Sequence, residues 1–200
     1  MPENKKLALE RAFNDVLNIL YGGDSWKNDD NLQETPKRMA KMYVDEIFRG
    51  LTQPEAPKLT VFKKTANSNM VTLFDVEVKS TCSHHFLPFV GRCHIGYIPR
   101  DGVVCGISKL ARIVEYFMTR PQMQEILIEQ ITDYIQEKLN PLGVIVVMEA
   151  RHYCMIVRGV KQFKSKMVSA AVRGCFDRNT DGCKDEFYAL LAMGKDANSF

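Results

Sequence analysis

The chain has 200 residues, of which 46% are hydrophobic and 26% are charged, and its formal net charge is +3. That composition supplies one sizeable core, and so mild a charge does not favour a nucleic-acid-binding protein, whose basic residues cluster on one face. No apolar stretch reaches the roughly 18 residues of a membrane span, and the polar start lacks the apolar segment of a signal peptide. We therefore expect a cytoplasmic protein with no nucleic-acid or membrane partner, whose six cysteines are thiols or ligands rather than disulfides.

Helical spacing of apolar residues predicts a first helix over residues 5–21, which Gly22 and Gly23 end. A second helix is expected from Thr35 as N-cap, with Pro36 at its first position, to Gly50. A linker is expected at residues 53–57. In chain order, the remaining predicted elements are strands at about 70–80 and 89–98, helices from Ser108 to about Met118 and from Pro121 to about Asn140, strands at 143–158 and 161–176, and a short helix after Cys183. Runs of strands separated by a run of helices predict an α+β fold with an antiparallel sheet.

Two distant segments carry residues that bind metals. Cys82 and His85 have the spacing of a metal half-site. His152 and Cys154 are two apart in the predicted strand 143–158, so their side chains are expected to point to one face. Taken alone, His152 and Cys154 are more typical of core residues, but together with the first segment they favour zinc. A tripod of two thiolates and one imidazole leaves one position open, which indicates a catalytic rather than a structural metal.

A second group of candidate residues is cationic. Ser108 and Lys109 begin a predicted helix, whose free N–H groups and positive dipole end favour an anion. Each pair of cations could also be an ordinary solvated helix face. Five cations together suit a highly charged ligand such as a triphosphate: Arg38, Lys41, Lys109, Arg112 and Arg158. The sequence has no Gly-x4-Gly-Lys loop, so side chains would hold the phosphates. Glu125, beside Gln124, either stabilises a helix start or pairs with the N–H edge of guanine.

These motifs resemble the GTP cyclohydrolase I family over roughly residues 5–193. The matching stretches are Glu34 to Gly50, Ser80-Thr-Cys-Ser-His-His-Phe86, Gly106-Ile-Ser-Lys-Leu-Ala-Arg112, Arg120-Pro-Gln-Met-Gln-Glu125 and His152-Tyr-Cys-Met-Ile-Val-Arg-Gly159. The resemblance implies the tunnelling fold, with a β-β-α-α-β-β antiparallel sheet and helices on one face. An N-terminal helical segment, residues 1–57, would precede the catalytic domain, residues 58–200. Subunits would join their sheets into a barrel as a homodecamer, with active sites between subunits.

The resemblance also implies an activity and a role for each candidate residue. The protein would be a hydrolase acting on cyclic amidine C–N bonds, converting GTP and water to 7,8-dihydroneopterin triphosphate and formate for pterin, folate or 7-deazaguanine synthesis. Zn²⁺ would be held by Cys82, His85 and Cys154, and His84 and His152 would transfer protons. Gln124 and Glu125 would contact guanine, and Ser108 would lie near the ribose. The triphosphate contacts implied are Arg38, Lys41, Lys109, Arg112 and Arg158.

The chain departs from the family pattern in two places. Ser83 replaces the usual Glu of Cys-Glu-His-His, and residues 166–172 have fewer hydroxyl groups than usual. Ser83 keeps open an alternative, a purine- or pterin-binding protein with reduced or altered turnover. Three further classes are less favoured. A pyruvoyl-tetrahydropterin synthase relative would need three metal-binding histidines with a His-x-His pair. A nitrile reductase relative would use a cysteine nucleophile, and a structural zinc module would need a fourth ligand.

Overall fold

The computed structural model describes residues 2–53, 55–63 and 69–196, and the chain divides into two units, residues 1–54 and 55–200. The domain boundary predicted between residues 57 and 58 lies close to this division and stays a prediction. Pro54, within the predicted linker, lies outside the described residues. In the part of the chain that is described, no helix has both the length and the apolarity that crossing a membrane requires.

The N-terminal unit is helical, as predicted. Helix α1 (Pro2–Tyr21) packs against α2 (Thr35–Met42), which continues as a π-helical turn, η2 (Tyr43–Ile47), and a 3-10 turn, η3 (Arg49–Leu51). A further 3-10 turn, η1 (Ser25–Asn28), carries the buried Trp26, whose indole N–H donates to Asn18 Oδ1 at 2.9 Å. The predicted N-cap Thr35 is wrong by one residue. Glu34 holds that position, because its carbonyl accepts the first hydrogen bond of the helix, from the N–H of Arg38 at 3.0 Å.

The second unit is built on a five-stranded sheet with the order β5-β2-β3-β6-β7. Its long strands are β2 (Val71–Cys82), β3 (Pro88–Ile98), β6 (Gly143–His152) and β7 (Met167–Gly174), all antiparallel to their neighbours. Only the short β5 (Pro121–Gln122) runs parallel to β2. A separate ribbon pairs β1 (Val61–Lys63) with β4 (Val103–Cys105). The predicted α+β class with an antiparallel-rich sheet is confirmed.

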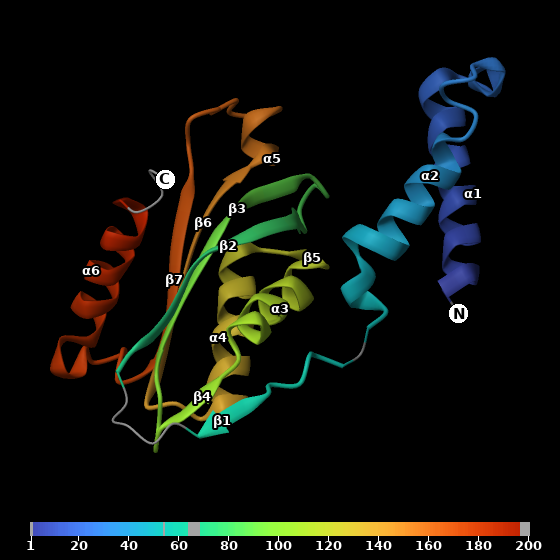
Figure 1. Cartoon of the computed structure of the whole chain (residues 1–200). Coiled ribbons are helices and arrows are strands. Elements are labelled where there is room, and N and C mark those ends of the chain that lie inside the picture. The colour runs from blue at the N-terminus through green and yellow to red at the C-terminus, as the bar shows by residue number, and fades with distance from the viewer. Residues whose placement is uncertain (1, 54, 64–68, 197–200) are drawn as a thin grey trace. The chain divides into compact units, whose positions relative to one another are not determined.

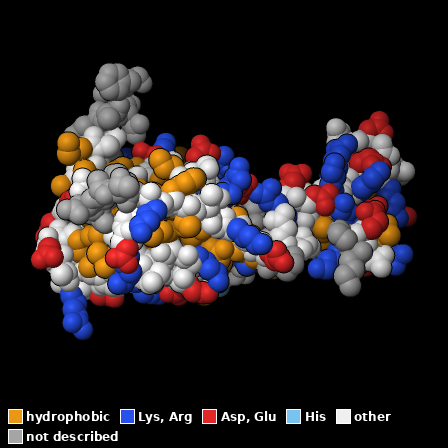
Figure 2. Space-filling model, turned by 60° about the horizontal axis from the view of Figure 1, so that its bottom comes forward, with side chains coloured by type: hydrophobic (Ala, Val, Ile, Leu, Met, Phe, Trp, Pro, Cys, Tyr) orange, Lys and Arg blue, Asp and Glu red, His pale blue; other side chains and the backbone are white. Residues whose placement is uncertain are grey.

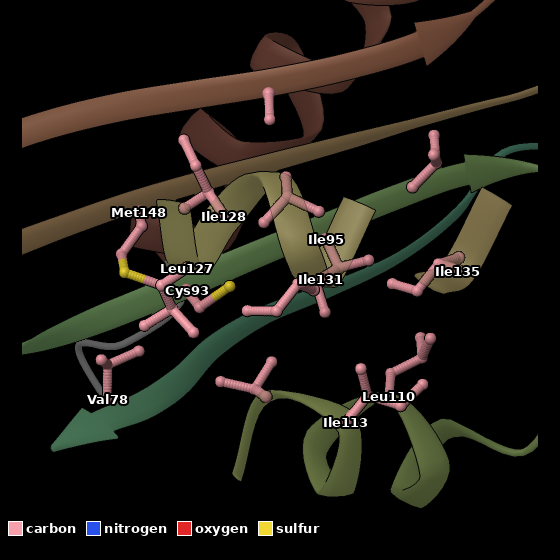
Figure 3. Close-up of a cluster of buried hydrophobic side chains, with 14 of the residues drawn as sticks. Val78, Cys93, Ile95, Leu110, Ile113, Leu127, Ile128, Ile131, Ile135 and Met148 are labelled. Atoms are coloured by element: carbon pink, nitrogen blue, oxygen red, sulfur yellow. The ribbon is translucent and has the colours of Figure 1, made fainter. Parts of the chain in front are cut away.

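Two helices between β4 and β6 cover one face of the sheet, α3 (Ile107–Met118) and α4 (Gln124–Leu139). Alternate residues of the strands point to this face and meet the apolar stripe of each helix. Figure 3 shows this core, where Cys93 and Ile95 of β3 and Met148 of β6 lie against Ile131 of α4. Each is fully buried, and burying one such side chain contributes roughly 1.5–3 kcal/mol.

The opposite face of the sheet is covered by α6 (Cys183–Asp196), which follows a 3-10 turn, η4 (Thr180–Gly182). Phe187 and Leu191 of α6 pack on Ile145 and Val147, which alternate with the residues of the first core. The helices therefore lie on both sides of the sheet (Figure 1). The expectation of helices on one face holds for α3 and α4 and is wrong for α6, which is also longer than the short helix predicted.

Three further predicted boundaries are wrong, and each correction bears on the site. Gly106, not Ser108, is the N-cap of α3. Pro121 belongs to β5, because residues 121–122 pair with the end of β2, and α4 starts at Gln124. The strand predicted over 143–158 ends at His152, and a helical turn, α5 (Tyr153–Ile156), follows.

Candidate metal centre

The thiols of Cys82 and Cys154 and the imidazole of His152 come together at one end of the sheet. One ligand atom from each lies within 4.8 Å of the others. Cys82 ends β2, and Cys154 lies in α5, which begins where β6 ends. Strand β3 separates β2 from β6 in the sheet, and the turn after β2 and α5 lie at the same end of it (Figure 1).

A tight turn fixes Cys82. Its N–H donates to the carbonyl of Leu87, and its carbonyl accepts from the N–H of Phe86, each at 2.9 Å. Phe86 has a φ of 53°, the left-handed conformation that closes the turn. The next residue, Ser83, donates its N–H to the carbonyl of Gln122 at 3.0 Å, so β5 holds the turn from the side.

Cys154 lies in a helical turn, so the alternation of side chains along a strand does not describe its position. The prediction that it shares a strand face with His152 is wrong, because the chain leaves the extended conformation after His152. The helical turn that follows still brings Cys154 beside Cys82. Burial raises the pKa of the Cys154 thiol, and the neighbouring Cys82 raises it further. A bound cation would oppose both effects, because it favours the thiolate.

His152 is the most constrained of the three residues. Its ring stacks on Phe89 with a centroid separation of 4.8 Å and an interplanar angle of 10°. The two residues are direct partners in the β3–β6 ladder. Its Nε2 lies 2.9 Å from Oε1 of Gln124. Burial lowers the pKa of His152, and the charge of Glu125 opposes that shift.

The two histidines of the turn lie outside this cluster in the structure. His84 and His85 are exposed, with ring centroids 6.3 Å apart in an edge-on arrangement. Nε2 of His85 lies 2.6 Å from Nη1 of Arg158. The structure thus brings Cys82, Cys154 and His152 together, and it places His85 beside Arg158, a predicted phosphate contact.

The predicted substrate contacts lie in three places. Gln124 and Glu125 start α4 next to His152, Gln124 being fully buried and Glu125 exposed. Ser108 and Lys109 lie at the start of α3 and Arg112 lies near its middle. Met118, at the other end of α3, accepts a hydrogen bond through its carbonyl from Ser80 near the end of β2. At 1.5 Å per residue, Ser108 and Met118 are about 15 Å apart along the helix axis. Arg38 and Lys41 are exposed on α2, in the other unit.

Two residues of the site escaped the sequence analysis. Phe89 stacks on His152, and the hydroxyl of Ser169 contacts the buried amide of Gln124 at 2.8 Å. Both contacts depend on strand register, which alternation of side chains does not specify. The only available signal was that Ser169 is a lone hydroxyl in the 166–172 stretch.

An α+β protein that gathers two thiols and an imidazole at one end of its sheet has the features of a metal-dependent enzyme. A family model described as GTP cyclohydrolase I matches residues 9–192. The GTP cyclohydrolase 1 of Carboxydothermus hydrogenoformans is 52% identical over 147 residues, 74% of this chain and 76% of that protein. That of Pelotomaculum thermopropionicum is 50% identical over 183 residues, 92% of this chain and 95% of that protein. The chain belongs to the GTP cyclohydrolase I family.

A solved structure, the archaeosine synthase QueF-Like in the apo form, has a TM-score of 0.40 and 16% identity, covering 56% of this chain and 97% of that chain. So distant a similarity supports no conclusion about fold or function.

Proposed function

We propose that this protein is a zinc-dependent GTP cyclohydrolase I, which converts GTP and water to 7,8-dihydroneopterin triphosphate and formate. The observation that carries the proposal is the meeting of Cys82, His152 and Cys154 within the residues that the family model matches. The product could supply pterin, folate or 7-deazaguanine synthesis.

The donor atoms of the site fit zinc. Soft thiolates with an imidazole are characteristic zinc ligands, and three protein ligands leave a position for reaction. Cys82 and Cys154 are the proposed thiolate ligands. Either His85 or His152 could supply the imidazole. We assign His85, because Cys-x-x-His is a half-site spacing and the family resemblance implies His85 as the ligand. When bound, zinc would supply a Lewis acid that makes water nucleophilic at neutral pH.

The remaining residues would bind GTP and move protons. Opening the imidazole ring of guanine requires water to attack C8 and a proton to reach a ring nitrogen, and a second hydrolysis then releases formate. Histidines suit such transfers, because their ordinary pKa of about 6.5 lies close to neutral pH. We assign these transfers to His84 and His152. Glu125, exposed beside His152, is the proposed guanine contact, since a carboxylate can accept from two N–H groups. The carboxamide of Gln124 is engaged within the protein.

The triphosphate site would be shared between subunits. Arg158 lies beside His85 at the metal end of the sheet, whereas Ser108 and Lys109 lie at the start of α3 and Arg112 lies near its middle. A second copy would supply the α3 cations, as the active sites between subunits implied by the family resemblance require. Strand β7 is at the sheet edge and could pair with another copy. We propose the tunnelling-fold barrel and the homodecamer that the family resemblance implies.

Exposed apolar residues support self-association. Phe62 of β1, Ile107 at the start of α3 and Val168 of β7 are each more than half exposed. Figure 2 shows hydrophobic side chains among charged ones on the visible surface of the larger unit. Apolar surface of this kind is common where subunits meet.

Incubation of the pure, zinc-loaded protein with GTP tests the proposed activity. We expect stoichiometric formate and a pterin that becomes fluorescent after oxidation. Absence of both products under these conditions would rule the activity out. Tight binding of GTP that is recovered unchanged would instead favour the purine- or pterin-binding alternative raised by Ser83.

A further inference from the structure

We propose that Gln124 is a positioning residue, whose buried carboxamide accepts a hydrogen bond from Nε2 of His152 and leaves Nδ1 as the ring nitrogen free to exchange a proton. The inference rests on the proposed function, which gives His152 a proton-transfer role. It adds that the transfer occurs at Nδ1 of His152. It also gives Gln124 a role other than the guanine contact expected from the family resemblance.

The carboxamide of Gln124 is fully buried and is engaged on both sides. Its Nε2 lies 3.1 Å from the carbonyl of Met148, 2.8 Å from Oγ of Ser169 and 3.4 Å from the carbonyl of Met167. Its Oε1 lies 2.9 Å from Nε2 of His152. A buried polar group whose partners are all protein atoms has little capacity left for a ligand.

The identity of the partners fixes the direction of every bond. Backbone carbonyls only accept hydrogen bonds, so the nitrogen of the amide must face Met148 and Met167. Its oxygen must therefore face His152, and an amide oxygen also only accepts. Nε2 of His152 consequently carries a proton and donates it to Gln124, and Nδ1 is the ring nitrogen that Gln124 does not engage.

The ring is held in its plane as well as at its edge. Phe89 stacks against it with an interplanar angle of 10°, which resists tilting, while the Gln124 bond resists rotation within the plane. Gln124 is itself secured because it is the first residue of α4 and its amide spans β6 and β7. A histidine so oriented presents Nδ1 in one direction, which favours proton transfer at a fixed place.

The chain offers a matched control for testing this role. Gln122 is also a buried glutamine, but its amide donates to the carbonyl of Phe117 at 2.7 Å and to Oε1 of Gln130 at 3.0 Å. Gln122→Met and Gln124→Met therefore remove the same chemical group from comparable burial. Only Gln124→Met removes a hydrogen bond to His152.

Steady-state kinetics with GTP separate the two possible roles of Gln124. We expect Gln124→Met to lower kcat by about 10–100-fold with KM changed by less than about threefold. Gln122→Met should keep kcat within about threefold of the parent. An increase in KM of tenfold or more at unchanged kcat would assign Gln124 to guanine binding and overturn the proposal. Equal losses of kcat in both variants would overturn it too, because the effect would then be structural.

A second measurement does not depend on turnover. In protein labelled with ¹⁵N-histidine, the ring signals of His152 can be identified by their loss in His152→Asn. Whenever the parent ring is neutral, we expect its proton to be on Nε2, and we expect a mixture of tautomers in Gln124→Met. A parent ring protonated only at Nδ1 would refute the positioning role even if GTP is hydrolysed. The expected tautomer without any GTP hydrolysis would support it while the proposed activity fails.

Discussion

The thiols of Cys82 and Cys154 lie within 4.8 Å of each other although one ends β2 and the other lies in α5, across strand β3. Burial and the neighbouring Cys82 both raise the pKa of Cys154. Two thiols so placed gain from a cation, because each becomes a thiolate ligand only when its proton leaves. The two thiols, with His152, could therefore hold a metal ion.

Replacing Cys154 with alanine removes one of the two proposed thiolate ligands. We expect Cys154→Ala to lower zinc content and GTP turnover by at least about tenfold, because a site with two remaining ligands binds zinc weakly. Metal analysis after dialysis, together with formate release, measures both. Cys175→Ala is the control, since Cys175 packs under α6 and lies outside the metal cluster. Full zinc occupancy in Cys154→Ala would contradict the ligand assignment.

Paired histidine variants decide which imidazole binds the metal. We expect His85→Ala to lose zinc, and we expect His152→Ala to keep zinc while its kcat falls by about 10²–10⁴-fold, the usual contribution of a general acid or base. Zinc content and kcat are measured on the same preparations. The reverse pattern, with zinc lost only in His152→Ala, would make the cluster of Cys82, His152 and Cys154 the complete ligand set.

Much of the fold could be predicted from the sequence, because long segments have clear periodicity. Residues 71–82 and 88–98 are strands, close to the predicted bounds. Helix α4 ends at Leu139 and is capped by Asn140, which has the left-handed conformation common after a helix. The prediction that Pro121 starts a helix is wrong, because proline is common both at the first position of helices and in the edge strands of sheets. Only the pairing of residues 121–122 with the end of β2 decides between these, and that pairing is a long-range contact.

The site was less predictable than the fold. The meeting of Cys82 and Cys154 was expected from residue types, but the strand alternation used to orient Cys154 does not apply in α5. The contacts of Phe89 and Gln124 with His152, and of Ser169 with Gln124, depend on the register of β3, β6 and β7. Register is fixed by turns and core packing across the whole sheet, so no local pattern reveals it.

Mixing two inactive variants tests whether subunits share an active site. Arg112→Ala removes a proposed triphosphate contact of α3, and Cys154→Ala disables the proposed metal site. If each site takes Arg112 from one copy and Cys154 from another, co-expressed variants should regain about a quarter of parental activity, the random-pairing value for two-subunit sites. Each variant expressed alone is the control. Activity no higher than that of the separate variants would place both residues in one subunit's site.

Because of the buried thiol of Cys93, we expect the free energy of unfolding to depend on pH in the alkaline range. Burial raises its pKa from 9.0 to about 12 in the folded protein. The unfolded chain therefore loses this proton first, so the stabilisation is fully present below about pH 9 and is lost as pH rises toward 12. We expect the free energy of unfolding to fall by up to about 1.4 kcal/mol per pH unit from this group over that interval. Chemical denaturation at several pH values measures the slope.

Cys93→Ala should reduce that slope, although it also leaves a small cavity that lowers stability equally at every pH. The slope rather than the absolute stability is therefore the quantity to compare. Burial also raises the pKa of Tyr97 and of Cys175, so a smaller slope of the same sign should remain in the variant. An identical slope in the parent and in Cys93→Ala would show that the Cys93 thiol ionises as readily in the folded protein as in the unfolded chain.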